Sequence, residues 1–235
     1  MLFMHEVHAV VGEREREFEA AYRDGWMPRL AEDDDARLLW YLNHAHGSGP
    51  SYQVVTVTAI RDGDAYARLA DRLHEGDLAE WWRAVGALRY EVRGRMMLPV
   101  HWSPLQEVDL ATVPTGGAEH GLSLYMEDTG WPSAPLDDYI RLWDEEYYRF
   151  MRDLPPEHRI LEIEGCFQVA HGAGTRPEAT LMQKILNYDL LLNLITEPED
   201  YDPDTWPGTY MYGGLRYRDQ WESKLLRTSA WSPLH

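Results

Sequence analysis

The sequence predicts an α+β fold made of two tandem βαββαβ repeats, whose antiparallel sheets pack face to face as an intramolecular α/β barrel. Three short words occur twice in the same order, which indicates a duplication. They are Ala45-His46-Gly47-Ser48-Gly49 with Ala170-His171-Gly172-Ala173-Gly174, Leu88-Arg89-Tyr90 with Leu215-Arg216-Tyr217, and Trp102-Ser103-Pro104-Leu105 with Trp231-Ser232-Pro233-Leu234. A repeat of roughly 115 to 125 residues is far longer than a solenoid unit, so we expect each copy to form a domain-sized fold.

These words divide the chain into a first repeat at 1–105, a linker at 106–119 and a second repeat at 120–235. The second repeat carries an insertion at about 197–214. Because a βαββαβ unit covers only one sheet face with its helices, the other face needs a partner. Pairing the two bare faces would enclose a cavity, and such cavities bind small molecules.

The elements of the first copy follow from periodicity and composition. Residues 2–11 alternate and are typical of a strand, which Gly12 ends. Residues 13–30 place Phe18, Tyr22 and Trp26 at helical spacing. The rest of the copy predicts strands at 37–46 and 52–60, a helix from 64 to 88 with a break at Gly76, and a strand at 95–100.

The second copy repeats this order with longer connections. Its elements are a strand at 122–127, a helix at 136–151, a hairpin of strands at 160–170 and 179–186, a helix from 189 to 195, and a last strand at 225–231. Within the first of these helices, Tyr139, Trp143, Tyr147 and Phe150 recur at helical intervals, which predicts a core face.

Composition narrows the function classes. The formal net charge is -18, from 40 acidic against 22 basic residues, which makes nucleic acid and anionic membrane surfaces poor partners. The single cysteine, Cys166, excludes an internal disulfide and a cysteine-rich metal site. The N-terminus lacks a basic stretch followed by an apolar one, so we expect a cytoplasmic protein.

Three segments of the first copy resemble a known family. They are His5-Glu6-Val7-His8, Tyr52-Gln53-Val54-Val55-Thr56-Val57 and Leu98-Pro99-Val100-His101-Trp102-Ser103-Pro104-Leu105. They resemble the first strand, the third strand and the closing segment of a NIPSNAP-type domain of the dimeric α/β-barrel superfamily, whose units are ferredoxin-like. The second copy keeps mainly the ending. The resemblance implies the barrel fold but no single chemistry, since relatives include cofactor-free oxygenases, cyclases, isomerases, haem enzymes and plain ligand binders.

Alternation along two strands of the second copy points to candidate catalytic carboxylates. Glu164 lies on the polar side of the strand at 160–170, opposite Leu161 and Ile163, and Tyr125 and Glu127 lie on the polar side of the opening strand. If these side chains face the cavity, burial raises the pKa of the carboxylates and suits them to proton abstraction. The alternative is an ordinary strand face in contact with solvent.

Further side chains are predicted to bind the substrate. From the same alternation and its alignment with the first copy, they are Gln168, Tyr41 and Asn43. From the aromatic insertion, which is long enough to form a lid, they are Trp206, Tyr210 and Tyr212. Because tryptophan and tyrosine combine a ring with a polar group, we expect an apolar or aromatic small molecule.

The histidines have two interpretations. His46 and His171 recur before a Gly-x-Gly turn, so they are either acid-base groups or parts of the turn. His44, His46 and His8 form a weak alternative metal site, because His44 and His46 share a strand face. We predict no metal and no cofactor, with haem or a divalent metal as the alternative.

Three functions stay open at this stage. The first is cofactor-independent proton-transfer chemistry, as an isomerase, cyclase, lyase or cofactor-free oxygenase, on an apolar or aromatic substrate in the barrel cavity. The second is a haem- or metal-dependent enzyme in the same barrel, and the third is a binding or assembly protein without catalysis. The expected partner is a small-molecule ligand, with a homodimer as an open alternative to a monomer and no nucleic acid or membrane.

Overall fold

The computed structural model describes residues 1–196 and 213–235 of the chain, which form two compact units. The first unit comprises Met1–Leu98, Glu107–Leu124 and Leu225–His235, and the second comprises Pro99–Gln106 and Tyr125–Lys224. The Trp-Ser-Pro-Leu segments that end the two repeats, called the closing words below, are exchanged between the units. The segment at 102–105 belongs to the second unit and the segment at 231–234 belongs to the first. None of the helices in the described ranges has the length and hydrophobicity needed to span a bilayer.

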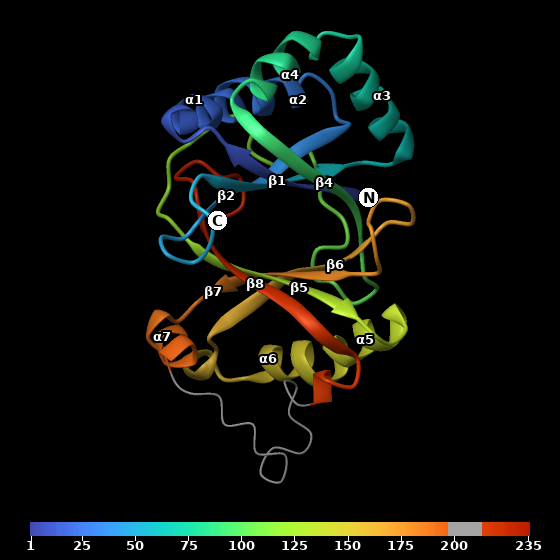
Figure 1. Cartoon of the computed structure of the whole chain (residues 1–235), viewed down its shortest axis with the longest axis vertical. Coiled ribbons are helices and arrows are strands. Elements are labelled where there is room, and N and C mark those ends of the chain that lie inside the picture. Colours follow the sequence, from blue (N-terminus) through green and yellow to red (C-terminus); the bar gives the residue numbers. More distant parts are fainter. Residues whose placement is uncertain (197–212) are drawn as a thin grey trace. The chain divides into compact units, whose positions relative to one another are not determined.

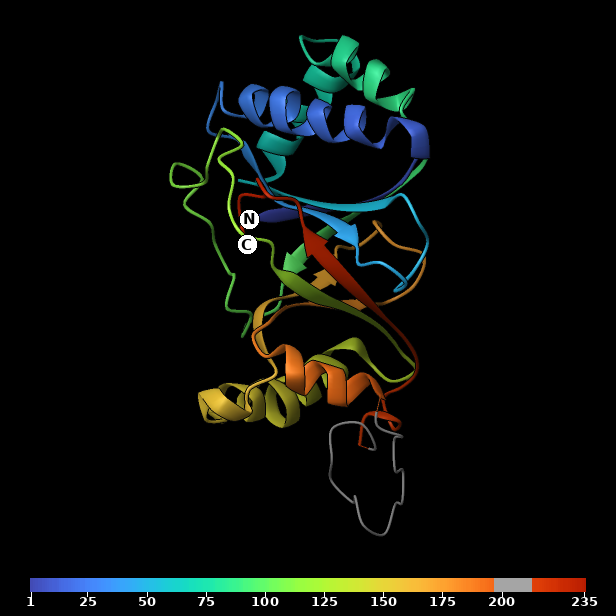
Figure 2. The same cartoon turned by 90° about the vertical axis from the view of Figure 1, so that its left-hand side faces the viewer.

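The first unit has the predicted βαββαβ order (Figure 1). Its elements are β1 (Leu2–Val10), η1 (Gly12–Arg14), α1 (Glu15–Ala20), η2 (Ala21–Trp26), α2 (Met27–Leu30), β2 (Ala36–His44), β3 (Gln53–Ile60), α3 (Gly63–His74), α4 (Ala79–Gly86) and β4 (Arg89–Pro99). The antiparallel order is β4-β1-β3-β2, and β2 also pairs with the last residues of β8 (Arg218–Thr228). The helices of this unit cover one face of its sheet (Figure 2).

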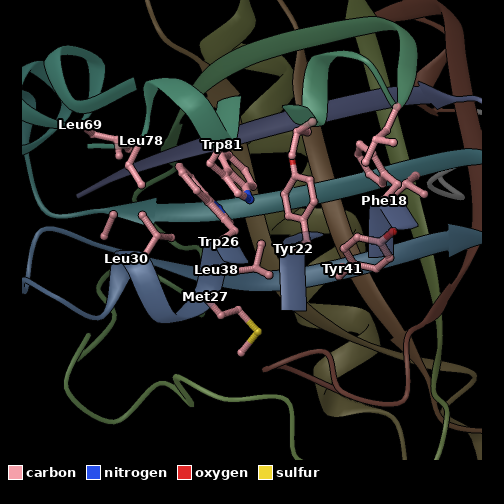
Figure 3. Close-up of a cluster of buried hydrophobic side chains, with 14 of the residues drawn as sticks. Phe18, Tyr22, Trp26, Met27, Leu30, Leu38, Tyr41, Leu69, Leu78 and Trp81 are labelled. Carbon is pink, nitrogen blue, oxygen red and sulfur yellow. The ribbon is translucent and has the colours of Figure 1, made fainter. Parts of the chain in front are cut away.

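Aromatic side chains of the first helical segment fill the space between these helices and the sheet (Figure 3). Phe18, Tyr22, Trp26 and Leu30 recur at every fourth residue, and all four are buried. In a regular α-helix this spacing drifts by about 40° per step, since each residue turns the chain by about 100°. The π-helix Ala21–Trp26 has wider turns, which keep the four side chains on one face.

The second unit has the same order. Its elements are β5 (Leu124–Pro132), α5 (Leu136–Leu142), η3 (Trp143–Tyr148), α6 (Arg149–Asp153), η4 (Pro156–His158), β6 (Leu161–Val169), β7 (Ala179–Ile185), α7 (Tyr188–Thr196) and β8. β7 pairs antiparallel with both β5 and β6. The predicted α+β class and the βαββαβ order of both repeats are therefore confirmed.

A π-helix, η3, lies at the matching place of the second unit, and it changes one predicted core position. Tyr139, Trp143 and Met151 are buried, again at multiples of four residues. Phe150, predicted to share their face, is 59% exposed, so that prediction is wrong. The physical reason is the wider turn, which moves Met151 rather than Phe150 onto the sheet side.

The second strand of each unit contains one extra residue. The register of β2 against β3 shifts around Leu39, and the register of β6 against β7 shifts around Glu164. These residues are equivalent when the copies are aligned on His46 and His171. Because side chains alternate between the two faces of a strand, such a bulge transfers every later side chain to the opposite face.

The closing words of the repeats bind these bulged strands. Ser232 Oγ accepts a hydrogen bond from the backbone N–H of Tyr41 at 3.1 Å, and Ser103 Oγ accepts one from the N–H of Cys166 at 2.9 Å. Tyr41 and Cys166 each lie two residues beyond the bulge of their strand. The serines thus satisfy buried donors at equivalent places, which explains why the same four-residue word ends both repeats.

We expect Ser232→Ala and Ser103→Ala each to lower the free energy of unfolding by about 1–3 kcal/mol, because each leaves a buried backbone N–H without an acceptor. Denaturant unfolding followed by circular dichroism measures this change. Ser51→Ala, in an exposed turn, is the matched control and should change stability by less than about 0.5 kcal/mol. Equal effects of all three substitutions would contradict this role of the closing serines.

Candidate functional site

Two of the predicted catalytic residues lie in contact in the second unit. Tyr125, from β5, donates a hydrogen bond from its hydroxyl to Oε2 of Glu164, from β6, at 2.9 Å. The extra residue in β6 is Glu164 itself, so the bulge places this carboxylate beside the phenol. Burial raises the pKa of Glu164, while the hydrogen bond from Tyr125 and the charge of Lys184 oppose that rise.

The third predicted catalytic residue, Glu127, lies two residues along β5 from Tyr125 and on the same face. Its side chain is fully buried, and Oε1 lies 2.7 Å from Nζ of Lys224. Lys224 also lies 3.2 Å from Oε2 of the half-exposed Glu222. A buried ion pair in hydrogen-bond contact holds both charges in place. Glu127 therefore fits a structural role beside Tyr125 better than the role of a base.

The sheet register adds a residue that the sequence did not single out. Lys184 on β7 pairs with Tyr125 on β5 and with Glu162 on β6, and it is half-buried. Both lysines of the chain therefore lie beside the carboxylates of this sheet face. Their rarity among 22 basic residues is the signal that could have identified them.

The opposite face of this sheet, under the helices, carries a separate polar network. Tyr147, from the π-helix η3, donates to Oε1 of Gln183 at 2.7 Å, and Gln183 Nε2 donates to Oδ2 of Asp128 at 2.8 Å. Burial raises the pKa of Asp128 to about 6, against the lowering effects of Ser223, Gln183 and Arg218. The depth of this network, and the hydrogen bond that Gln183 donates to Asp128, favour a structural role.

The first unit carries a comparable network under its own helices. Arg89 Nη1 lies 2.7 Å from Nδ1 of His8, so Nδ1 accepts and Nε2 carries the proton of the neutral ring. That second nitrogen lies 3.0 Å from Thr56 Oγ1 and 3.3 Å from the hydroxyl of Tyr22. Burial, with the charge of Arg89, holds the pKa of His8 well below its ordinary value. Burial raises the pKa of the neighbouring Glu6 to about 7.

The two networks occupy equivalent places. Glu6 and Asp128 are each the fifth residue of the first strand, and Arg89 and Arg218 are each the first residue of the last strand. In both units a tyrosine of the π-helix joins the network. This repeated carboxylate and arginine are not apparent from the sequence, because the two copies use different acids and because the matched motif pairs Arg89 with Arg216 rather than with Arg218.

The two repeated histidines lie in exposed turns. His46 precedes Gly47, whose φ is 82°, and His171 precedes Gly172, whose φ is 81°. Positive φ angles favour glycine, so the repeated His-Gly dipeptide has a direct backbone explanation. These positions agree with the interpretation in which each histidine belongs to its turn.

The predicted face shared by the substrate-binding residues is wrong beyond each bulge. Tyr41 packs under the helices, with its ring centroid 5.7 Å from that of Tyr22. Asn43 pairs with Val54, a core residue on that same side. Gln168, four residues past the bulge of β6, also turns to the helix-covered face and away from Tyr125.

The remaining predicted residues do not join this site. Trp206, Tyr210 and Tyr212 lie outside the described residues. Among residues 1–196 and 213–235, no three His, Cys, Asp or Glu side chains gather as a metal site would require. A surface pocket of about 300 Å³ in the first unit, lined by residues that include Met1, Asp34 and Arg61, contains none of the predicted groups.

We expect Glu6→Gln to flatten part of the pH dependence of stability. The pKa of Glu6 is higher in the folded chain than its ordinary value of 4.5, so the folded state binds the extra proton. Its stabilising contribution is complete below about pH 4.5 and is lost as the pH rises through about 7. Denaturant unfolding between these pH values should show a smaller loss in Glu6→Gln than in the wild type. Glu13→Gln, at an exposed position, should retain the wild-type slope, and an unchanged slope in Glu6→Gln would contradict the assignment.

We expect Tyr125→Phe to raise the pKa of Glu164 further, because the substitution removes a hydrogen bond that stabilises the ionised carboxylate. Carbon-13 NMR titration of the glutamate side chains measures this shift. Tyr147→Phe removes a tyrosine hydroxyl from the other face of the same sheet and should leave Glu164 unchanged. A fall in the pKa of Glu164 in Tyr125→Phe would show that the pair is not formed.

The comparisons with known proteins show the fold. No family model matches the chain, and no curated protein matches it. A protein proposed to be a monooxygenase from Lactobacillus acidophilus is 9% identical, with 99% of this chain and 97% of that chain covered and a TM-score of 0.56. An anthrone oxidase-like protein is 8% identical, with 97% and 91% covered and a TM-score of 0.62.

Part of the chain is also similar to an uncharacterised NIPSNAP domain protein from Burkholderia xenovorans. The two are 18% identical, with 43% of this chain and 97% of that chain covered and a TM-score of 0.37. At these identities, the similarities that cover nearly the whole chain show a shared fold and no more.

Proposed function

We propose that the chain is a cofactor-independent enzyme that transfers a proton on an apolar or aromatic small molecule, with Glu164 as the base. The observation that carries this proposal is the hydrogen bond from Tyr125 to the half-buried Glu164. Burial makes the carboxylate a stronger base than one in water, and its partial exposure leaves it within reach of a ligand.

Tyr125 has a positioning role in this mechanism. Its ring is buried and its hydroxyl donates to Oε2, so the carboxylate is held by one oxygen while Oε1 can accept the substrate proton. The proton leaves a C–H or O–H bond of the substrate, and the bonding electrons stay on the substrate. Return of the proton to another atom of the substrate completes an isomerisation. In an elimination the electron pair instead forms a double bond and expels a leaving group, which takes the proton from Glu164, and in a cyclisation the electron pair forms a bond to an electrophilic atom of the substrate, whose displaced electron pair takes the proton.

The ion pair of Glu127 and Lys224 favours the ionised form of Glu164 in its hydrogen bond with Tyr125. Without Lys224, a buried carboxylate two residues from Tyr125 would add negative charge beside Glu164 and oppose its ionisation. With it, Glu127 is neutralised within hydrogen-bond distance. The pKa of Glu164 is therefore determined mainly by its burial, by the hydrogen bond from Tyr125 and by the charge of Lys184.

The fold agrees with an enzyme of this kind. One protein of the same fold is described as a proposed monooxygenase and another as anthrone oxidase-like, so this fold is associated with chemistry on small organic molecules. A cofactor-free oxygenase also begins by removing a proton from its substrate. Glu164 is the group of this chain that would perform that step.

The haem- or metal-dependent alternative has less support from the described residues. Both ring nitrogens of His8 lie within hydrogen-bond distance of other side chains, and His46 lies in an exposed turn. His44, the last residue of β2, belongs to no group of three such side chains in the part of the chain that the structure describes. Neither His8 nor His46 fits the role of a buried ligand, so we derive no step through a metal or haem. The non-catalytic alternative predicts that loss of the Glu164 charge changes no reaction.

Deuterium incorporation tests the proposal. Small molecules released from the natively purified protein and identified by mass spectrometry, together with a panel of enolisable and phenolic compounds, are incubated with the protein in D₂O and followed by NMR. We expect the wild type to accelerate exchange at carbon and Glu164→Gln to lose about 10²–10⁴-fold of that rate, the usual contribution of a general base.

Glu162→Gln is the matched control, because Glu162 is an exposed acid two residues away on the same strand. It should retain most of the exchange rate. Equal losses in Glu162→Gln and Glu164→Gln, or no loss in either, would contradict the role of Glu164.

A further inference from the structure

The first half of β4 lies open at one edge of the sheet of the first unit. Gly94 is exposed there, and because glycine has no side chain, this exposure is that of the backbone itself. The far end of the strand differs. Met97 is buried, and just past β4, within the second unit, the N–H of Val100 donates to the carbonyl of Cys166 in β6 at 3.1 Å. Residues 90–94, called the β4 edge below, are therefore the open part of the strand.

The hydrogen-bond pattern of β1 indicates which backbone groups of the β4 edge are directed outward. Val10 donates its N–H to the carbonyl of Tyr52, on the side of β3. Since N–H groups point alternately to the two sides of a strand, the odd-numbered residues of β1 point to β4, where odd-numbered residues lie opposite them. The N–H and C=O groups of Val92 and Gly94 therefore point away from β1, toward the open side.

The side chains of the β4 edge carry charges of both signs in a self-complementary order. Glu91 and Arg93 are 58% and 68% exposed, and Nε of Arg93 lies 3.1 Å from Oε1 of Glu91. They flank Val92 and lie on the same face of the strand, since they are two residues apart. An antiparallel copy of this segment, centred on Val92, would place Glu91 of each strand directly opposite Arg93 of the other.

We propose that two copies of the chain associate by pairing their β4 edges antiparallel, with Val92 at the centre. A two-fold axis between the strands requires a central residue whose backbone groups point outward, as those of Val92 and Gly94 do. Centring on Gly94 would place Arg93 opposite Arg95, which is unfavourable. Centring on Val92 gives two attractive pairs of Glu91 with Arg93, so the charges select this register.

Tyr90 adds apolar area at the end of the β4 edge. It is 80% exposed, the highest value among the large apolar side chains of the described ranges. The register against β1 shifts at this residue, because Ala9 pairs with Glu91 and Val10 pairs with Arg89. A bulge and charged side chains protect an edge from unselective pairing, and here they also limit the pairing to a few residues. The interface is therefore small, and we expect a dimer that dissociates on dilution.

Sedimentation equilibrium of the full chain tests this proposal. We expect the mass of the wild type to rise with concentration from 27.3 kDa toward twice that value. Glu91→Arg places arginine opposite arginine at both pairs, and Arg93→Glu places glutamate opposite glutamate. Each variant should raise the dissociation constant of the dimer by about tenfold or more.

An equimolar mixture of the two variants gives a sharper result. In a mixed dimer every glutamate again lies opposite an arginine, so the mixture should form dimers about as tightly as the wild type does. The double variant Glu91→Arg, Arg93→Glu should also recover the wild-type dissociation constant, which shows that the strand tolerates both substitutions.

Glu17→Arg is the matched control, because it makes the same charge change in an exposed ion pair with Arg14, on α1 of the same unit, and should leave the dimer intact. A wild type that stays monomeric at every concentration would overturn the proposal. So would a dimer that survives Glu91→Arg, or a mixture of the two variants that associates no more tightly than either variant alone.

Discussion

One extra residue in the second strand of each unit determines the strand register, the faces of the side chains that follow, and the contact between Glu164 and Tyr125. Leu39 and Glu164 shift the register, so the side chains that follow them exchange faces. A bulge also disturbs the backbone ladder, and a serine of a closing word accepts the N–H two residues later in both strands. In β6 the extra residue is itself a carboxylate, which the bulge brings to the hydroxyl of Tyr125. Strand geometry and candidate chemistry therefore have the same origin.

Depth separates the carboxylates into two groups. Glu6 and Asp128 lie under the helices, where burial raises their pKa values to about 7 and about 6 and where packed side chains surround them. Such groups link stability to pH, because the folded state holds protons that the unfolded chain releases. Glu164 lies on the opposite face and is only half-buried. Burial there raises the pKa of Glu164, while part of the side chain stays exposed.

Much of the fold could be predicted because it depends on local periodicity and on the duplicated words. Tyr125 and Glu164 of the candidate site were chosen from alternation, and the two side chains lie in hydrogen-bond contact, while their role stays a prediction. Alternation failed past the bulges for Tyr41 and Gln168, because one additional residue inverts every later position and leaves no mark in the residue types. Lys184 was not singled out for another reason, since its place beside Tyr125 depends on which strand pairs with β7.

By itself, the sequence determined the duplication, the βαββαβ order and the apolar faces of the helices, since these follow from repeated words and from the spacing of residues near one another in the chain. Only the tertiary structure decided the register of the strands, the turn of the π-helices and the exchange of the two closing words. These features depend on hydrogen bonds between residues far apart in the chain. Side chains such as Glu164 and Lys184 acquire their surroundings from those bonds, and no local pattern contains them.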